Sequence, residues 1–104
     1  MSHLIASKLT FSAKWDAMSD DERTAEQVAT YEIVAKCGGD IKSSHVLWSD
    51  NCLFSIVEYP DEVSSFKSEQ AITRRGAFVL QSQRAVPLDE VLAWQDEVRT
   101  IAGR

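Results

Sequence analysis

The sequence contains few of the residues that mark secreted, metal-binding and cofactor-binding proteins. It has only two cysteines, Cys37 and Cys52, and two histidines, His3 and His45, which are far apart in the chain. Scattered ligands of this kind form no zinc motif, and two thiols without CxxC spacing are expected to be reduced core residues. The GxGxxG, GxxxxGK[ST], HExxH and GxSxG patterns are also missing. We therefore expect no metal site and no cofactor.

Long apolar runs and clustered positive charges are missing as well. Residues 1–5 have neither a positive region nor an apolar stretch of signal-peptide length, and no apolar run approaches the ~18 residues of a membrane helix. We expect a cytoplasmic protein that does not contact membranes. The net charge is −5, and the one basic cluster, Arg74-Arg75, falls at an expected helix end. Nucleic-acid binding needs a broader basic surface, so we do not expect it.

What is present is an average globular composition, with 44% apolar and 26% charged residues in 104 positions. This length fits a single domain, residues 1–104, with one core. A chain this short buries only about 60–70% of its unfolded surface, so burial against a partner would add to its stability.

Alternating apolar residues predict four strands, at residues 3–9, 41–48, 52–59 and 78–86. The middle two flank Ser49-Asp50-Asn51 and form a hairpin. A two-residue turn at Asp50-Asn51 would pair Leu47 with Phe54, His45 with Ile56, and Ser43 with Glu58 on one face. It would pair Trp48 with Leu53, Val46 with Ser55, and Ser44 with Val57 on the other face. A different turn would change these pairs.

Capping signals predict the helices between the strands. Ser19 and Glu22 form a capping box that begins a helix ending at Cys37, before two glycines. We expect this helix to turn four residues inward: Ala25, Val28, Val34 and Ala35. A second helix runs from Asp61 to Gly76, and a short one is expected from the spacing of Phe11, Trp15 and Met18. A terminal helix after Pro87 carries an apolar stripe that ends at Ile101.

The resulting order, βαββαβ with an extra C-terminal helix, indicates an α+β protein of the ferredoxin-like plan. In this plan the helices cover one face of a four-stranded antiparallel sheet, and the other face is normally polar. Here the second face would expose Leu47, Phe54 and Ile56, or else Trp48, Leu53 and Val57. An apolar patch of this size indicates an interface, so we expect a homodimer that pairs through the sheet face.

Several short segments resemble the GYD-domain family. They are Gly38-Gly39, the hairpin, Glu58-Tyr59-Pro60-Asp61, Gly76 and Arg84-Ala85, and the resemblance spans about residues 4–94. The family's Gly-x-Tyr-Asp signature is replaced by Ser49-Asp50-Asn51-Cys52. The resemblance extends to the wider dimeric α/β barrel superfamily, which implies a homodimer with a cleft between sheet and helices. Members of that superfamily include cofactor-free monooxygenases, isomerases, cyclases and haem proteins, and others have no known activity.

His45, Glu58 and Ser43 are the candidate catalytic group, because the predicted register puts them on one sheet face. His45 and Glu58 would lie diagonally, about 7–8 Å apart, so the carboxylate could orient a histidine that acts as general base. Arg84, which shares a strand face with Ser82, could hold an anionic oxygen of the substrate.

The candidate substrate-binding residues are Trp48, Ser43, Ser7, His3 and Phe54, with Trp48 as a wall of the pocket. Structural roles are the alternatives. His45 could be a hydrogen-bonded strand residue, and Glu58 could form an ion pair with Lys42 or Arg84. Trp15 and Trp94 are expected in the core.

Two functions are compatible with these features. The first is a cofactor-free enzyme that uses acid–base chemistry, of isomerase, cyclase or monooxygenase type, on an enolisable or aromatic substrate. The second is a non-catalytic homodimer that binds a small-molecule ligand or another protein. The presence of a ligand cavity would distinguish the enzyme from a homodimer that only binds other proteins, because such an interaction module would not need a cavity.

Overall fold

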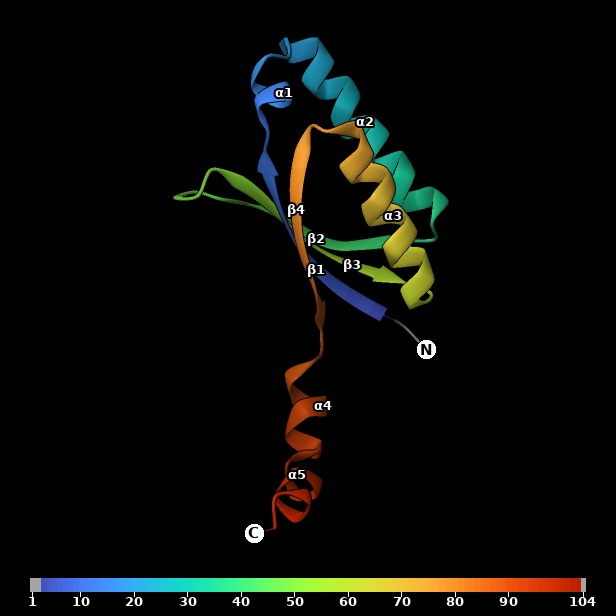
Figure 1. Ribbon diagram of the computed structural model, residues 1–104, viewed down its shortest axis with the longest axis vertical. Coiled ribbons are helices and arrows are strands. Elements are labelled where there is room, and N and C mark those ends of the chain that lie inside the picture. Colours follow the sequence, from blue (N-terminus) through green and yellow to red (C-terminus); the bar gives the residue numbers. More distant parts are fainter. Residues whose placement is uncertain (1–2, 104) are drawn as a thin grey trace.

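The computed structural model describes residues 3–103, which form a four-stranded antiparallel sheet and five helices. The strands are β1 (His3–Phe11), β2 (Asp40–Leu47), β3 (Cys52–Tyr59) and β4 (Phe78–Ala85). The helices are α1 (Ala13–Asp16), α2 (Asp20–Lys36), α3 (Glu62–Arg75), α4 (Leu88–Ala93) and α5 (Gln95–Ile101). The sheet order is β2-β3-β1-β4, and α2 and α3 lie on one side of it (Figure 1). The predicted α+β, ferredoxin-like fold is confirmed.

The predicted helix ends are confirmed by their hydrogen bonds. The Ser19 hydroxyl accepts from the Glu22 amide at 3.2 Å, and the Glu22 carboxylate accepts from the Ser19 amide at 2.9 Å. This capping box satisfies two amides that the first turn of α2 would leave unpaired. Asp61 caps α3 in a similar way, accepting from the Ser64 amide at 2.7 Å, and Gly76 ends the helix at φ +78°. Local sequence chemistry therefore determines where both helices begin and where α3 ends.

The two-residue turn predicted for the β2–β3 hairpin is wrong. The turn spans four residues, Trp48–Asn51, and Leu47 pairs with Cys52, His45 with Phe54, and Ser43 with Ile56. Because the register differs from the predicted one by two residues, each side chain keeps its predicted face while its partner changes. An irregularity between Ile41 and Ser43 then places Asp40 opposite Glu58.

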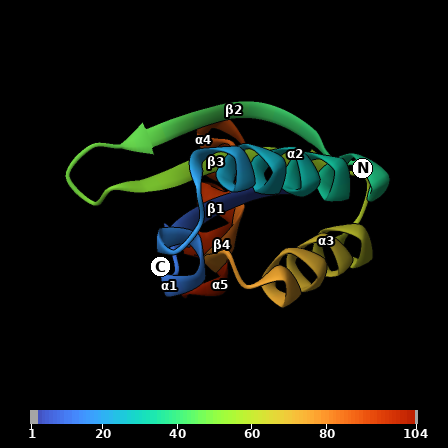
Figure 2. The ribbon, with the colours of Figure 1, turned by 90° about the horizontal axis from the view of Figure 1, so that it is seen from above.

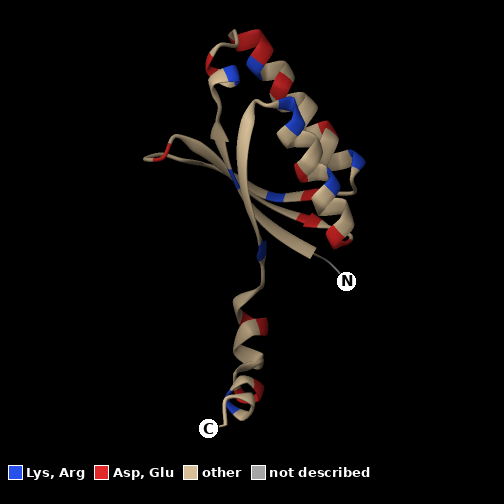
Figure 3. Ribbon diagram, viewed as in Figure 1, with Lys and Arg blue, Asp and Glu red and all other residues tan. Residues whose placement is uncertain are grey.

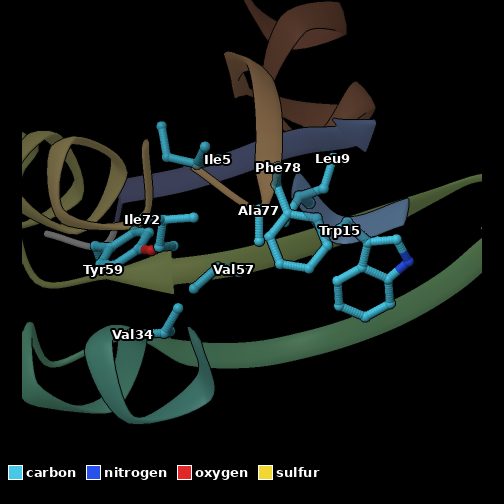
Figure 4. Close-up of a cluster of buried hydrophobic side chains, with 9 residues drawn as sticks. All are labelled: Ile5, Leu9, Trp15, Val34, Val57, Tyr59, Ile72, Ala77 and Phe78. Carbon is cyan, nitrogen blue, oxygen red and sulfur yellow. The ribbon is translucent and has the colours of Figure 1, made fainter. Parts of the chain in front are cut away.

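The core lies between the sheet and the helices (Figure 4). The strands contribute Ile5, Leu9, Val57, Tyr59 and Phe78, and the helices contribute Trp15, Val34 and Ile72, with Ala77 before β4.

The predicted inward face of α2 is confirmed only for Val34. Val28 is 49% exposed, and Ala25 and Ala35 are exposed too, whereas Glu26 and Thr30 are buried. The reason is an ion pair: Glu26 faces α3, where it binds the guanidinium of Arg75 at 2.6 Å.

The second face of the sheet has no helix over it in Figure 1, and in Figure 2 the β2–β3 hairpin projects beyond the helices. We call this surface the open face. Its apolar residues alternate with the core residues along the strands and include Leu4, Ala6, Leu47, Phe54, Ile56 and Val79. Val79 is 57% exposed, and the other five are of intermediate exposure in the single chain.

The predicted terminal helix is two short helices, α4 and α5, which break at Trp94. They extend away from the end of β4 (Figure 1), and we call residues 86–103 the C-terminal arm. Trp94, which we expected in the core, is 47% exposed on this arm. None of the helices in the described part of the chain is long and apolar enough to cross a membrane.

Candidate ligand-binding site between the sheet and the helices

A cavity of about 260 Å³ lies between the core-facing side of the sheet and helices α2 and α3. Its walls are mostly apolar and include Leu9, Val34, Leu53 and Leu80, and α2 adds the ring of Tyr31. Small-molecule pockets usually measure about 300–1,000 Å³ and combine apolar walls with a few polar groups. The cavity is therefore near the lower end of that range and suits a small ligand.

A row of four serines crosses the sheet beneath the helices. Ser44 pairs with Ser55, Ser55 with Ser7, and Ser7 with Ser82, so each strand contributes one serine. The Ser7 and Ser82 hydroxyl oxygens are 2.8 Å apart, and those of Ser44 and Ser55 are 3.3 Å apart. Ser44, Ser55 and Ser7 line the cavity. Each hydroxyl has one proton and two lone pairs, so the pairs can still bond to a ligand.

The serine row also explains why space remains in the core. Interiors are normally filled to the density of organic crystals by interlocking apolar side chains. At the centre of this sheet, short serine side chains occupy positions that flanking residues such as Leu9, Leu53 and Val57 fill with larger groups. The site therefore has a polar floor and apolar sides.

Tyr59 provides a further polar group at the cavity wall. Its hydroxyl donates to the Ser68 hydroxyl at 2.9 Å, and both side chains are buried. Burial raises the pKa of the Tyr59 phenol above its ordinary value, so the group stays protonated near neutral pH. Among the described residues that line the cavity there is no lysine or arginine. The polar groups here are therefore neutral hydroxyls and an amide, with Glu69 as the one acidic side chain.

The predicted group of His45, Glu58 and Ser43 lies on the open face, away from the serine row. The predicted diagonal contact is wrong, because His45 pairs with Phe54 and Glu58 pairs with Asp40. Phe54 and Glu58 are four residues apart on one strand, so His45 and Glu58 are separated by about 13 Å along the sheet. Glu58 instead lies 3.5 Å from the Lys42 ammonium, which confirms the ion-pair alternative.

His45 is exposed and borders the cavity at β2, between Ser44 and Val46. Since side chains alternate along a strand, its imidazole points to the face opposite those two neighbours.

Arg84 and His3 line a second cavity, of about 290 Å³, between β1, β4 and α3. Ser82 is also part of its wall, so the serine row reaches both cavities. Glu62 and Glu69 line this second cavity too. The cavity therefore has both positive and negative side chains, whereas a site that holds an anionic oxygen of a substrate would be mainly positive. Arg84 and His3 are thus close to each other, on the face of the sheet opposite to His45 and Glu58.

The other predicted binding residues have different positions. Ser7 lines the first cavity, between the sheet and helices α2 and α3. Phe54 is partly buried on the open face, opposite His45. Trp48 is 94% exposed at the hairpin turn and forms no pocket wall in the single chain.

Sequence reasoning missed the serine row as a unit. It identified Ser7 and Ser82, but it did not connect Ser44 and Ser55 with them. Ser7 and Ser55 stand between apolar residues at the core-facing positions of their strands, whereas Ser82 lies between Leu80 and Arg84. That pattern is visible in the sequence, although the pairing that brings the four together is not.

The described residues offer no obvious metal centre. Within residues 3–103 no group of three or more histidine, cysteine, aspartate or glutamate side chains could hold a metal ion. Cys52 is a fully buried free thiol, and Cys37 is a partly exposed one.

The sequence matches no protein-family model, and it matches no curated protein at a significant level of similarity. The resemblance to the GYD-domain family therefore stays a prediction, and the inference of function has to come from the site.

Proposed function

We propose that this protein is a homodimer that binds a small, largely apolar molecule in the cavity between the sheet and the helices. The observation that carries the proposal is the serine row, which puts hydroxyl groups on the floor of a mostly apolar cavity. A packed core gains nothing from hydroxyls at these positions, because a buried hydroxyl such as that of Ser7 must find a hydrogen-bond partner.

The lining indicates the chemistry of the ligand. Serine hydroxyls, which can both donate and accept, suit a neutral oxygen-bearing group such as a carbonyl, a hydroxyl or an amide, whereas the Tyr59 proton is already donated to Ser68. An anionic group would face Glu69 with no lysine or arginine among the described lining residues. The rest of the ligand would be apolar, either aromatic or aliphatic, and small enough for about 260 Å³.

The dimer forms through the open face. Helices α2 and α3 cover only one side of the sheet, and the other side carries Leu4, Leu47, Phe54 and Ile56. Pairing two copies face to face removes this surface from water, and a two-fold axis makes the two patches complementary. The resemblance to the dimeric α/β barrel superfamily supports the same arrangement.

A cofactor-free enzyme is the second candidate, because His45 borders the cavity on the edge strand β2. Its imidazole points to the open face, so this chemistry needs a substrate that reaches that face. Its acid–base chemistry would rest on His45 without Glu58, which pairs with Lys42 instead. If it is an enzyme, wild-type protein converts a bound ligand to a product detectable by mass spectrometry, and a His45→Ala variant binds the ligand without converting it. Equal conversion by both proteins would exclude His45 as the base.

Ligand binding can be tested by a thermal-shift screen of small neutral oxygen-bearing compounds, followed by calorimetry on the hits. Ser55→Ala removes one hydroxyl from the floor and should weaken binding about 3–10-fold, the usual effect of losing one hydrogen bond. Ser55→Leu fills the cavity and should abolish binding. Ser49→Leu is the matched control, because it makes the same change at an exposed residue of the hairpin turn that does not line the cavity.

The proposal requires the two leucine variants to differ. If Ser55→Leu binds the hits as tightly as the wild type does, the ligand is not in this cavity. If no compound of this class shifts the melting temperature, and none copurifies in native mass spectrometry, the binding function itself is contradicted.

A further inference from the structure

The C-terminal arm exposes an apolar stripe that the rest of the described chain does not cover. Leu88, Leu92, Trp94, Val98 and Ile101 are between 47% and 78% exposed. With Val91 the set recurs at spacings of three or four residues, along Leu88, Val91, Trp94, Val98 and Ile101, and Leu92 lies one turn after Leu88 at the edge of the stripe. Trp94 has right-handed helical angles, φ −86° and ψ −7°, so the stripe continues from α4 into α5. An amphipathic helix of this kind normally buries its apolar side.

The arm is marginal as a free helix. Helices α4 and α5 have 6 and 7 residues, and joined through Trp94 they span the 14 positions 88–101. An isolated helix shorter than about 12–15 residues is marginal in water even with the best helix formers. The two segments contain Val, Thr and Asp, which are weaker helix formers. A helical arm therefore needs a surface against which to pack.

The chain's own body does not provide this surface. Only Val86 and Pro87 connect β4 to α4, and the arm points away from the sheet and from α2 and α3 (Figure 1). Pro87 has φ −55° and ψ 137°, an extended conformation that continues the direction of β4. The occupant of the stripe is therefore another molecule.

Charge argues against a nucleic acid or an anionic membrane as that molecule. The arm carries four carboxylates, Asp89, Glu90, Asp96 and Glu97, and Arg99 is the one cation between residues 88 and 101 (Figure 3). Phosphate surfaces attract basic segments, and interfacial membrane helices are rich in lysine and arginine. A protein surface with exposed apolar groups is the better match.

We infer that the C-terminal arm of each protomer docks on a second copy of this chain and completes the dimer interface. The inference rests on the open-face dimer proposed above. The arm continues directly from β4, an edge strand of the sheet, so a copy seated on the open face lies beside the arm.

The buried area supports the same occupant. Four strands of eight or so residues cover about 26 Å by 19 Å, roughly 500 Å² on each partner and about 1,000 Å² in total. A stable dimer usually buries about 1,600 Å². A helical arm of about 21 Å by 10 Å buries roughly 200 Å² of its own surface and roughly 200 Å² of the partner's surface. If each protomer docks its arm on the other, the two arms add about 800 Å² and the total buried area is about 1,800 Å².

The test compares two adjacent aspartate substitutions in the full-length protein by sedimentation equilibrium. Leu92→Asp places a charge in the apolar stripe and should raise the dimer Kd about 10–100-fold, the effect of losing one buried leucine. Ala93→Asp adds the same charge about 100° around the helix and should change the Kd less than about 3-fold. Ile101→Asp is a second variant in the stripe and replaces Leu92→Asp if that protein does not fold.

A photocrosslinking residue at position 92 should also yield a covalent dimer, and one at position 93 should not. A wild-type protein that is monomeric at micromolar concentration would overturn both the open-face dimer and the arm contact, while ligand binding in the cavity could still be measured. A wild-type dimer whose Kd is the same in the Leu92→Asp, Ile101→Asp and Ala93→Asp proteins would overturn the arm contact alone.

Discussion

The ion pair between Glu26 and Arg75 allows a direct test of how α2 and α3 are held together. Arg75 donates through Nε at 2.6 Å and through Nη2 at 3.0 Å to the two oxygens of the Glu26 carboxylate. The Glu26 side chain is 8% exposed and that of Arg75 is 43% exposed. Arg75→Met keeps most of the aliphatic length and removes both donors. It should therefore leave a buried carboxylate without these two hydrogen bonds.

The expected cost is about 2 kcal/mol in the free energy of unfolding. Breaking a fully buried ion pair costs about 3–5 kcal/mol, because the remaining charge has lost its partner. Here the Arg75 side chain is nearly half exposed, so water can hydrate part of the Glu26 carboxylate once the guanidinium is removed. The loss in the free energy of unfolding should therefore be closer to the ~1–3 kcal/mol of an unsatisfied buried acceptor. The double variant Glu26→Leu/Arg75→Met should regain at least half of this loss, because the buried charge is gone.

Urea unfolding followed by circular dichroism measures both values. With a slope of about 1–3 kcal/mol per M for a domain of this size, Arg75→Met should lower the midpoint by about 1 M. A loss below about 0.5 kcal/mol would show that the pair is solvated and does not support the packing of the helices. A double variant that is less stable than Arg75→Met would contradict the idea that the unpaired carboxylate causes the loss.

Two further predictions concern backbone packing and pH. Gly39→Ala should destabilise the protein by more than about 2 kcal/mol in the same assay. The reason is steric, because the added Cβ would lie 2.8 Å from the Tyr59 ring and 2.6 Å from a Val34 methyl. A loss of stability near zero would mean that the backbone moves freely at this position. Hydrogen bonds at the helix N-termini hold the pKa of Glu22 and of Asp61 below their ordinary values of 4.5 and 3.8. Such lowered values stabilise the fold above these pH values, and this stability is lost as the pH falls through the folded-state pKa values, so the urea midpoint should decrease below about pH 4.5. Asp61→Asn keeps a capping oxygen without the titration and should make the decrease shallower.

The parts of this protein that the sequence determined by itself are those with short-range causes. The start of α2 depends on hydrogen bonds between residues three apart, Ser19 and Glu22, and the end of α3 depends on Gly76, which can adopt a positive φ. Strand alternation likewise predicted which face each hairpin residue occupies. From the order of these elements the ferredoxin-like topology followed, because few arrangements of βαββαβ bury one core.

Other features were decided only by tertiary structure. In these cases the local sequence fits more than one arrangement, and contacts between residues distant in the sequence determine which one forms. A hairpin shifted by two residues has the same hydrophobic alternation, so only the four-residue turn separates His45 from Glu58. Glu26 points inward because Arg75 of another helix is there to pair with it. Ser7, Ser44, Ser55 and Ser82 form one row only because the sheet order β2-β3-β1-β4 aligns four strands. The candidate site depends on this long-range register, and no local signal in the chain encodes it.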